Sequence, residues 1–232
     1  MSCPLYIRSV YTLLSSMCSI EGIVSYGKKY GYTSLGLVDK NVLAGAMSFK
    51  KECQKANIKP VFGLEFEIKA LDRTFEAVLY AKDDEGFKNL MGLSSEICTS
   101  EDESIDIDTL NKYRDHNVLC LMSDNMPLTY AVDKKMDLNE MLKTQNDLFG
   151  KYIVGLVDHD KAINVSRDSQ LKDFLKRNGI SCIALNRTFY LDRDDSQDYE
   201  VLKCIRDKVT INDDNGSVDS GRHILDNDEF NS

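Results

Sequence analysis

The stretch that decides the fold is PLYIRSVYTLLSSMCSIEGIVSYGKKYGYTSLGLVDKN, residues 4–41. It opens with a short apolar run, PLYIR at residues 4–8, and closes with another, TSLGLVD at residues 33–39. Between them, Ser19 is expected to cap the start of a helix that ends at Gly31. Continuous apolar runs of this length are typical of strands covered on both faces. The stretch therefore predicts a strand–helix–strand unit.

The same alternation continues along the chain. The pattern predicts seven strands, at residues 4–8, 33–39, 59–68, 75–81, 117–122, 152–157 and 181–185. Helices are expected at residues 20–30, 42–57, 83–98, 105–114, 135–149, 169–178 and 195–207. This order indicates an α/β fold, either a doubly wound sheet or a barrel, and the strand number favours a distorted seven-stranded (β/α) barrel. The third and fourth strands alternate more than the others, so a hairpin with a turn near Leu71–Thr74 is an alternative.

The composition is that of an acidic globular protein. The 232 residues are 42% hydrophobic and 29% charged, and the formal net charge is −9. Such a chain binds nucleic-acid phosphates poorly without a separate basic surface, because electrostatic attraction supplies most non-specific affinity. Seven single cysteines without a CxxC pair favour buried, reduced thiols and a cytoplasmic location. We find no signal peptide and no apolar run of membrane-spanning length.

In α/β barrels the chemistry gathers at the carboxyl ends of the strands. The polar or aromatic positions near those ends are Tyr6, Arg8, Asp39, Lys40, Glu65, Glu67, Ser123, Asp124, Asp158, His159 and the run Asn186–Phe189. The chain contains neither a nucleophile elbow nor a P-loop, and no Ser, His and Asp set stands out as a triad.

Several pieces of the sequence resemble one family. They read PLYIRSVYTLL, GLVDKN, GAMSFKKECQKANIKPVFGLE, YAKDDEGFKNLMGLSS and IALNRTFYLDRDDSQDYEVLKCIRDKVTINDD. Their order and spacing resemble the polymerase-and-histidinol-phosphatase (PHP) domain, in the version found at the N-terminus of bacterial DNA polymerase III alpha subunits. The corresponding family pieces begin HLHVHSEYSLL, ALTDHG, GAVEFYKAAKKAGIKPIIGCE, LAKNEEGYKNLLKLSS and VATNDVHYL. The resemblance covers most of the chain and is weakest from residue 99 to 165.

The resemblance implies a site for two or three divalent ions, which generate a hydroxide and clamp a phosphate. In this sequence the HxH residues become Tyr6 and Arg8, and the histidine that follows Asp39 becomes Lys40. The NDxH residues become Asn186–Phe189, with Arg187 and Phe189 in place of the ligands. Arginine cannot lose its proton to become a ligand. We therefore expect no catalytic residue, no metal and no other cofactor in this chain.

The seven vestigial metal-site positions are Tyr6, Arg8, Asp39, Lys40, Glu65, Arg187 and Phe189. Only Asp39 and Glu65 keep a ligand-type side chain, and without ions they would be uncompensated buried charges. Our hypothesis is that the basic side chains at these positions pair with the two acids. The two aromatic rings would then fill the remaining space.

The three histidines, His116, His159 and His223, match no ligand position of the family. His159 follows a predicted strand beside Asp158, so a metal site there is an alternative to a surface turn. The basic stretch at residues 48–59 is expected to be the solvated face of a helix, with a contact to a partner or to DNA as the alternative.

The resemblance implies the N-terminal PHP domain of a bacterial replicative DNA polymerase, a DNA-directed nucleotidyltransferase. Residues 1–212 would form the barrel, and residues 213–232 would begin the connection towards a polymerase core. The expected role is to buttress that core and to offer a docking surface. Expected partners are the remainder of the alpha chain and other replisome subunits such as a proofreading exonuclease. DNA would be met only through the parent polymerase, which would use Mg²⁺ in its palm domain, and no membrane is expected.

Two alternatives belong to other classes. One is a divergent metal-dependent PHP phosphoesterase or proofreading 3′–5′ exonuclease that uses Asp39 and Glu65 with His159 or Asp158. The other is a free-standing adaptor protein. Bound transition metal and hydrolysis of a phosphoester would favour the enzyme.

Overall fold

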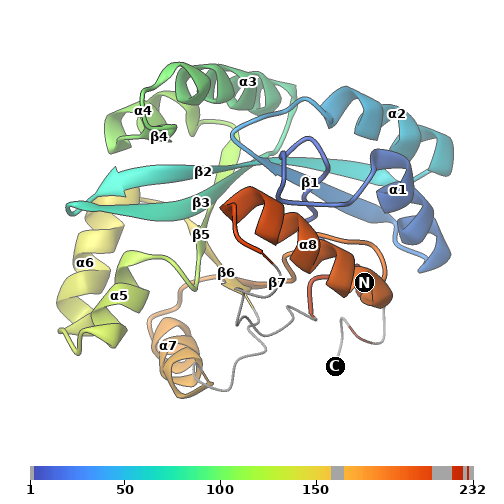
Figure 1. Ribbon diagram of the computed structural model, residues 1–232. Helices are drawn as coiled ribbons and strands as arrows, with labels where there is room; N and C mark the ends of the chain where they lie inside the picture. Colours follow the sequence, from blue (N-terminus) through green and yellow to red (C-terminus); the bar gives the residue numbers. More distant parts are fainter. Residues whose placement is uncertain (1–2, 158–164, 211–220, 227–228, 230–232) are drawn as a thin grey trace. The chain divides into compact units, whose positions relative to one another are not determined.

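The computed structural model describes residues 3–157, 165–210, 221–226 and 229 (Figure 1). The chain divides into two compact units, which are described separately. The first unit comprises residues 1–63 and 186–232, and the second comprises residues 64–185.

The first unit contains the strand–helix–strand stretch and the last helix. Its elements are α1 (Ile20–Lys29), β1 (Ser34–Lys40), α2 (Ala46–Ala56), the start of β2 (Lys59–Ala70), the short 3-10 helix η2 (Arg193–Asp195) and α8 (Ser196–Asp207). Helix α1 begins as predicted, because the Ser19 side chain accepts a hydrogen bond from the Gly22 backbone N–H. Its last turn carries two lysines, which suit the negative end of the helix dipole.

The core of the first unit lies between α1, α2 and β1. It is a cluster of buried apolar side chains that includes Ile7, Ile23, Leu35 and Phe49, all with 0% exposure. Ile224 belongs to the same cluster and is also fully buried. The described residues 221–226 are therefore part of this unit's core, while the predicted domain boundary at residues 212 and 213 includes positions outside the described residues.

The prediction of a strand at residues 4–8 is wrong. Only one isolated parallel bridge, between Ile7 and Thr188, forms there. On the other side, the Gly36 N–H donates to the Pro4 carbonyl and the Val38 N–H donates to the Ile7 carbonyl. Between these two hydrogen bonds, β1 advances by two residues and the first segment advances by three. This mismatch is that of a β-bulge, so a regular ladder of hydrogen bonds cannot form.

The second unit contains most of the sheet. Its remaining strands are β3 (Arg73–Ala81), β4 (Ser104–Ile105), β5 (Asn117–Met122), β6 (Ile153–Val157) and β7 (Cys182–Leu185). Its helices are α3 (Asp84–Thr99), α4 (Ile107–Tyr113), α5 (Pro127–Asp133), α6 (Leu138–Phe149) and α7 (Val165–Arg177). Helix α5 was not predicted, and Pro127 at its first turn is a favourable helix start.

Backbone hydrogen bonds give the strand order β1-β2-β3-β5-β6-β7, with β4 paired to β2 outside this path. Strands β5, β6 and β7 are parallel neighbours, whereas β3 and β5 are antiparallel. Strands β2 and β3 are joined by Leu71 and Asp72, both with positive φ (54° and 56°), as in a tight two-residue hairpin turn. The α/β class is confirmed, and the described residues form a sheet of seven strands. The hairpin alternative is correct, and β4 replaces the predicted first strand.

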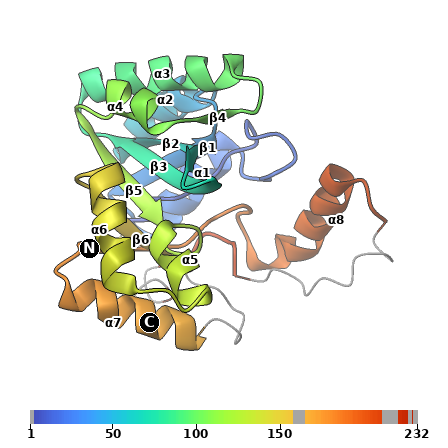
Figure 2. The ribbon, with the colours of Figure 1, turned by 90° about the vertical axis from the view of Figure 1, so that its left-hand side faces the viewer.

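Within the second unit, helices α3 and α4 lie beside strands β2 and β3, and helices α5, α6 and α7 lie beside the part of the curled sheet formed by β5, β6 and β7 (Figures 1 and 2). In the described part of the chain, no helix is long and apolar enough to cross a membrane.

Candidate functional site

The bridge between Ile7 and Thr188 brings four of the predicted positions together. Side chains alternate along extended backbone, so Tyr6 and Arg8 face away from Ile7, and Arg187 and Phe189 face away from Thr188. The Arg8 N–H donates to the Thr188 carbonyl (3.0 Å) and the Thr188 N–H donates to the Tyr6 carbonyl (3.1 Å). These hydrogen bonds hold Tyr6, Arg8, Arg187 and Phe189 in one place, which we call the aromatic–arginine cluster.

Within this cluster the arginines lie against the aromatic rings. Arg8 Nη2 donates a hydrogen bond of 2.9 Å to the Tyr6 hydroxyl, and Arg8 Cζ lies 4.7 Å from the centre of the Phe189 ring. Arg187 Cζ lies 5.7 Å from the centre of the Tyr6 ring. The two rings meet edge to face at 6.5 Å. Both distances between guanidinium and ring are within the range of a cation–π interaction.

Two further side chains from the C-terminal part of the first unit complete the packing. The ring of Tyr199, on α8, stacks on Phe189 with centroids 5.7 Å apart, and Arg222 Cζ lies 5.8 Å from the Phe189 ring centre. Tyr6 is 0% exposed, Arg8 is 8% exposed and Phe189 is 9% exposed. The space at these positions is therefore filled by rings and guanidinium groups of the chain itself.

Asp39, at the end of β1, is held by hydroxyl and amide donors. The backbone N–H and the hydroxyl of Ser9 each donate to it at 2.8 Å, and the Thr12 hydroxyl donates at 2.9 Å. Burial raises the pKa of the Asp39 carboxyl above its ordinary value, despite the opposing effect of these hydrogen bonds and of the Arg8 charge. Asp39 thus accepts hydrogen bonds from Ser9 and Thr12 and is also affected by the Arg8 charge, and its predicted pairing with basic side chains stays a prediction.

The remaining two vestigial metal-site positions are Lys40 and Glu65. Lys40 is half-buried, and its backbone N–H donates to the Thr12 hydroxyl at 3.1 Å. Glu65 lies on β2 in the second unit and is 2% exposed. Its predicted pairing with Arg8, Lys40 or Arg187 stays a prediction.

The hydroxyl-bearing loop that follows Arg8 was not predicted as part of the site. The Ser16 hydroxyl donates to the Arg8 carbonyl (2.6 Å) and lies 3.0 Å from the Phe189 carbonyl, and it accepts from the Cys18 N–H. Ser16 therefore links the two segments that carry the cluster. The sequence signal was the run SVYTLLSS at residues 9–16, in which hydroxyl residues recur on either side of two pairs of large residues.

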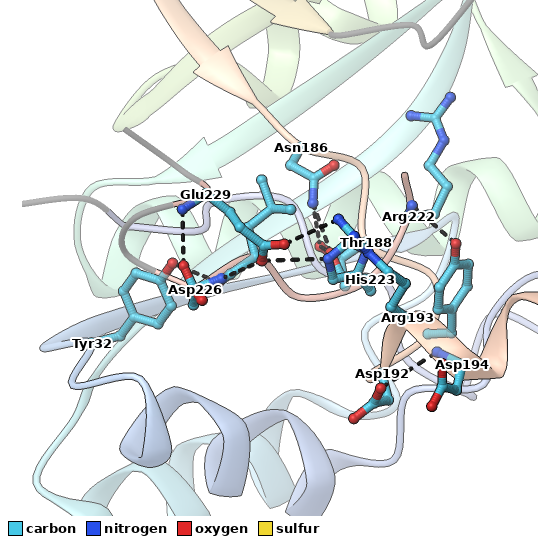
Figure 3. Close-up of polar contacts among 12 residues, drawn as sticks. Tyr32, Asn186, Thr188, Asp192, Arg193, Asp194, Arg222, His223, Asp226 and Glu229 are labelled. Atoms are coloured by element: carbon cyan, nitrogen blue, oxygen red, sulfur yellow. Dashed lines mark hydrogen bonds and ion pairs between the residues drawn. The ribbon is translucent and has the colours of Figure 1, made fainter. Parts of the chain in front are cut away.

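The segment that begins at Arg222 contacts the stretch of chain that carries Phe189, and Figure 3 shows its polar contacts with Asn186 and Thr188. Phe189 donates its backbone N–H to the Arg222 carbonyl at 2.8 Å, and the Asn186 side chain donates to the His223 carbonyl at 2.8 Å. The His223 ring stacks on Tyr190 with centroids 6.4 Å apart, and its Nε2 lies 3.4 Å from a Glu229 carboxylate oxygen. The position of Phe189 thus depends on residues more than thirty positions further along the chain.

The sequence profile of the PHP domain matches residues 4–167, which is more than half of the chain. The chain belongs to the PHP family. Two curated relatives of this PHP domain are DNA polymerase III alpha subunits. The protein from Halalkalibacterium halodurans is 28% identical over 223 residues, and the protein from Staphylococcus aureus strain COL is 28% identical over 229 residues.

These matches cover 90% and 98% of this chain but only 19% of each relative, so the chain spans about a fifth of their length. A solved structure of a candidate metal-dependent phosphoesterase from Bifidobacterium adolescentis shares the fold, with a TM-score of 0.55 at 8% identity. That similarity covers 80% of this chain and 86% of the other. The fold is therefore of the PHP phosphoesterase type.

The described residues of this PHP domain do not form a site for the metal ions that the family resemblance implies. In the part of the chain that the structure describes, no group of three or more His, Cys, Asp or Glu side chains could hold a metal ion. Both Asp39 carboxylate oxygens already accept hydrogen bonds from the chain. Arg8 and Arg187 carry fixed positive charges where the resemblance places ligands. We derive no catalytic step through a metal.

The two described histidines, His116 and His223, belong to no group of side chains that could hold a metal ion. His116 is exposed, and its Nδ1 lies 2.9 Å from an Asp83 carboxylate oxygen, which raises the pKa of the histidine. His223 is buried against Tyr190. His159 and Asp158 lie outside the described residues.

The cysteines only partly match the prediction of buried thiols. Cys18, Cys53, Cys120 and Cys204 are buried, Cys3 is half-buried, and Cys98 and Cys182 are exposed. Burial raises the pKa of the Cys18 and Cys53 thiols to about 12, so neither is ionised near neutral pH. All seven cysteines are free, in agreement with reduced thiols.

Proposed function

We propose that this chain is the PHP domain of a bacterial replicative DNA polymerase of the DNA polymerase III alpha type, and that its metal site has been replaced by the aromatic–arginine cluster. Its role is then structural: it buttresses the polymerase part of the protein and offers a surface for docking. The matches to DNA polymerase III alpha subunits over most of the chain support the parent protein.

The single observation that supports the loss of metal-dependent catalysis is the position of Arg8. Its guanidinium lies 4.7 Å from the Phe189 ring centre and donates to the Tyr6 hydroxyl. The three residues stand at three positions where the family resemblance places metal-binding histidines. A guanidinium keeps its proton at all physiological pH values, so a divalent cation placed there would be repelled rather than bound.

The partners follow from the parent protein and are part of the proposal. The first is the remainder of the alpha chain, and a proofreading exonuclease or another replisome subunit is a further candidate. DNA and Mg²⁺ would be bound by the polymerase part of the protein. The net negative charge of this domain would therefore not prevent the whole polymerase from binding DNA.

The test is to measure metal content and hydrolysis on the same preparation. The purified chain is equilibrated with Zn²⁺, Mn²⁺ or Fe²⁺, desalted and analysed for elements, and is then incubated with bis-p-nitrophenyl phosphate and with 3′-labelled single-stranded DNA. We expect far less than one ion per chain and no hydrolysis that a chelator abolishes. Stoichiometric metal together with chelator-sensitive hydrolysis would overturn the proposal in favour of a divergent phosphoesterase or exonuclease.

A further inference from the structure

Helix α8 is anchored on its inner side and carries two apolar side chains on its outer side. The ring of Tyr199 stacks on Phe189 with centroids 5.7 Å apart, and Tyr199 and Cys204 are only 3% and 5% exposed. On the other side of the helix, Val201 is 40% exposed and Ile205 is 59% exposed. A spacing of four residues makes these two side chains neighbours on the helix surface. Figure 2 shows α8 apart from α1 and α2, which belong to the same unit.

Two side chains of opposite charge flank this apolar pair at equal distances along the sequence. Asp198 lies three residues before Val201, and Lys208, the C-cap of the helix, lies three residues after Ile205. Both charged residues are exposed. Spacings of three, four and three residues place all four positions on one side of a helix. We call Asp198, Val201, Ile205 and Lys208 the outer face of α8.

The two basic side chains between these ends are paired within α8 itself. Lys203 Nζ and Arg206 Nε lie 2.9 Å and 2.7 Å from carboxylate oxygens of the same helix. Among the residues that the structure describes, no ion pair involves the side chain of Asp198 or Lys208. The outer face of α8 therefore ends in one acid and one base whose charges remain for a partner.

The order of side chains on this face is self-complementary. Position 203 is the midpoint of both the apolar pair and the charged pair. When two α8 helices lie antiparallel with position 203 at a twofold axis, Val201 of each copy meets Ile205 of the other. In the same arrangement Asp198 of each copy meets Lys208 of the other, so each contact occurs twice. A second copy of the chain thus supplies both the apolar and the charged complement of this face.

We propose that the outer face of α8 is a contact between two copies of this chain, with the two helices antiparallel. This inference goes beyond the proposed function and does not depend on it. The packing of Tyr199 against Phe189 holds the helix in place, which lowers the entropic cost of the contact. One pair of 12-residue helices buries less than the roughly 1,200 Å² of a stable interface, so the dimer is weak, with a dissociation constant of about 100 µM.

The first test is sedimentation equilibrium of the purified chain from about 10 µM to about 1 mM, in about 150 mM salt, which screens the repulsion between two acidic copies. We expect a monomer–dimer equilibrium. Ile205→Glu places two carboxylates near the twofold axis and should weaken the dimer at least tenfold. Met91→Glu, at a position of α3 that is similarly exposed (52%), is the control and should leave the dimer unchanged. A chain that stays monomeric up to about 1 mM, or a dimer that survives Ile205→Glu, would overturn the proposal.

Exchange of the two charges tests the antiparallel register. Asp198→Lys and Lys208→Asp, made in separate chains, each create two like-charge contacts per dimer and should raise the dissociation constant about tenfold. An equal mixture of the two variants restores both opposite-charge contacts and should associate within about threefold of the parent chain. The double variant with both changes in one chain keeps the self-complementary order and should dimerise like the parent. A mixture and a double variant that associate no better than the single variants would overturn the proposal.

Failure of this inference and failure of the proposed function give different results. A chain that stays monomeric and binds no metal overturns the contact between copies alone. Stoichiometric metal with chelator-sensitive hydrolysis overturns the proposed function, whatever the oligomeric state of the chain.

Discussion

The Arg8 guanidinium lies against the Phe189 ring, whose electron-rich face attracts a cation. In the proposed function, this fixed positive charge takes the place of a metal ion. The ring of Tyr199 stacks on the ring of Phe189. The result is a buried group of side chains at positions where the family resemblance places metal ligands.

The contribution of the aromatic–arginine cluster to the free energy of unfolding can be measured by substituting Phe189. We expect Phe189→Ala to lower the free energy of unfolding by about 3–5 kcal/mol, because a buried ring is lost together with its stacked neighbours. Phe189→Leu keeps most of the apolar volume but loses the face beneath Arg8. It should cost about 1–2 kcal/mol. Urea unfolding of both variants checks the prediction, and a Phe189→Leu variant as stable as the parent would show that the guanidinium contact contributes nothing.

A second prediction at this scale concerns the titration of Asp39. Its raised pKa means that the folded state binds the proton more tightly than the unfolded state. The extra stability that the protonated Asp39 gives the folded state is fully present below the ordinary aspartate pKa of about 3.9. It is lost as the pH rises through the higher pKa that Asp39 has in the folded state. Carboxyl NMR should place the Asp39 midpoint above about 3.9.

Unfolding experiments give the corresponding control. The stability difference between the parent protein and Asp39→Asn should change across that pH interval, because only the parent carries the titrating group. Asp147→Asn, at an exposed position of α6, should show no such change. A midpoint for Asp39 at or below the ordinary value would contradict the prediction.

At the scale of elements, the close approach of the first segment to β1 depends on one glycine. A Cβ at Gly36 would lie 2.1 Å from the Leu5 carbonyl oxygen, and backbone cannot move aside as a side chain can. Further along the same two segments, the Val38 N–H donates to the Ile7 carbonyl and the Ser9 N–H donates to Asp39. The element that was predicted as a strand is therefore an irregular segment whose position is determined by packing.

We expect Gly36→Ala to destabilise the chain by more than about 3 kcal/mol, above the usual cost of overpacking, because the clash is with backbone. Gly22→Ala is the matched control. Its Cβ would meet the end of the Leu191 side chain and the Ser19 hydroxyl, both of which are side-chain atoms that can move. Alanine favours the helix that contains it, and disturbing the Ser19 cap should cost only about 1 kcal/mol. Thermal or urea unfolding of the two variants distinguishes these cases, and equal stabilities would show that the segment at residues 4–8 adapts freely.

For the whole molecule, the central question is whether folding depends on a metal. A metal that binds only the folded state at a hundred times its dissociation constant adds about 2.7 kcal/mol of stability. In a chain of this length that corresponds to a shift in melting temperature of about 5–10 °C. The described side chains offer no such site, so stability is expected to come from packing alone.

The prediction is that EDTA leaves the melting temperature unchanged within about 1 °C, and that added Mn²⁺ does not raise it. Differential scanning calorimetry of the same preparation, with and without chelator, is the measurement. A fall of several degrees in EDTA that Mn²⁺ reverses would reveal a metal centre and would contradict the replacement of the site.

Much of the site could be predicted because its signals are local. The positions of Tyr6, Arg8, Arg187 and Phe189 follow from short motifs in order, and alternation along extended backbone explains why each pair shares a face. The start of α1 at Ser19 is equally local, since an N-cap needs only the next few residues.

The partners of these residues were decided by the tertiary structure. Ser9 and Thr12, rather than basic side chains, donate to Asp39, and Tyr199 and Arg222 reach Phe189 from elements that the sequence could not place beside it. The change of segment 4–8 from a strand to a single bridge has the same origin. Residue type and the spacing of apolar residues are properties of neighbouring positions in the sequence. Strand register and side-chain contacts depend on how distant segments pack against one another.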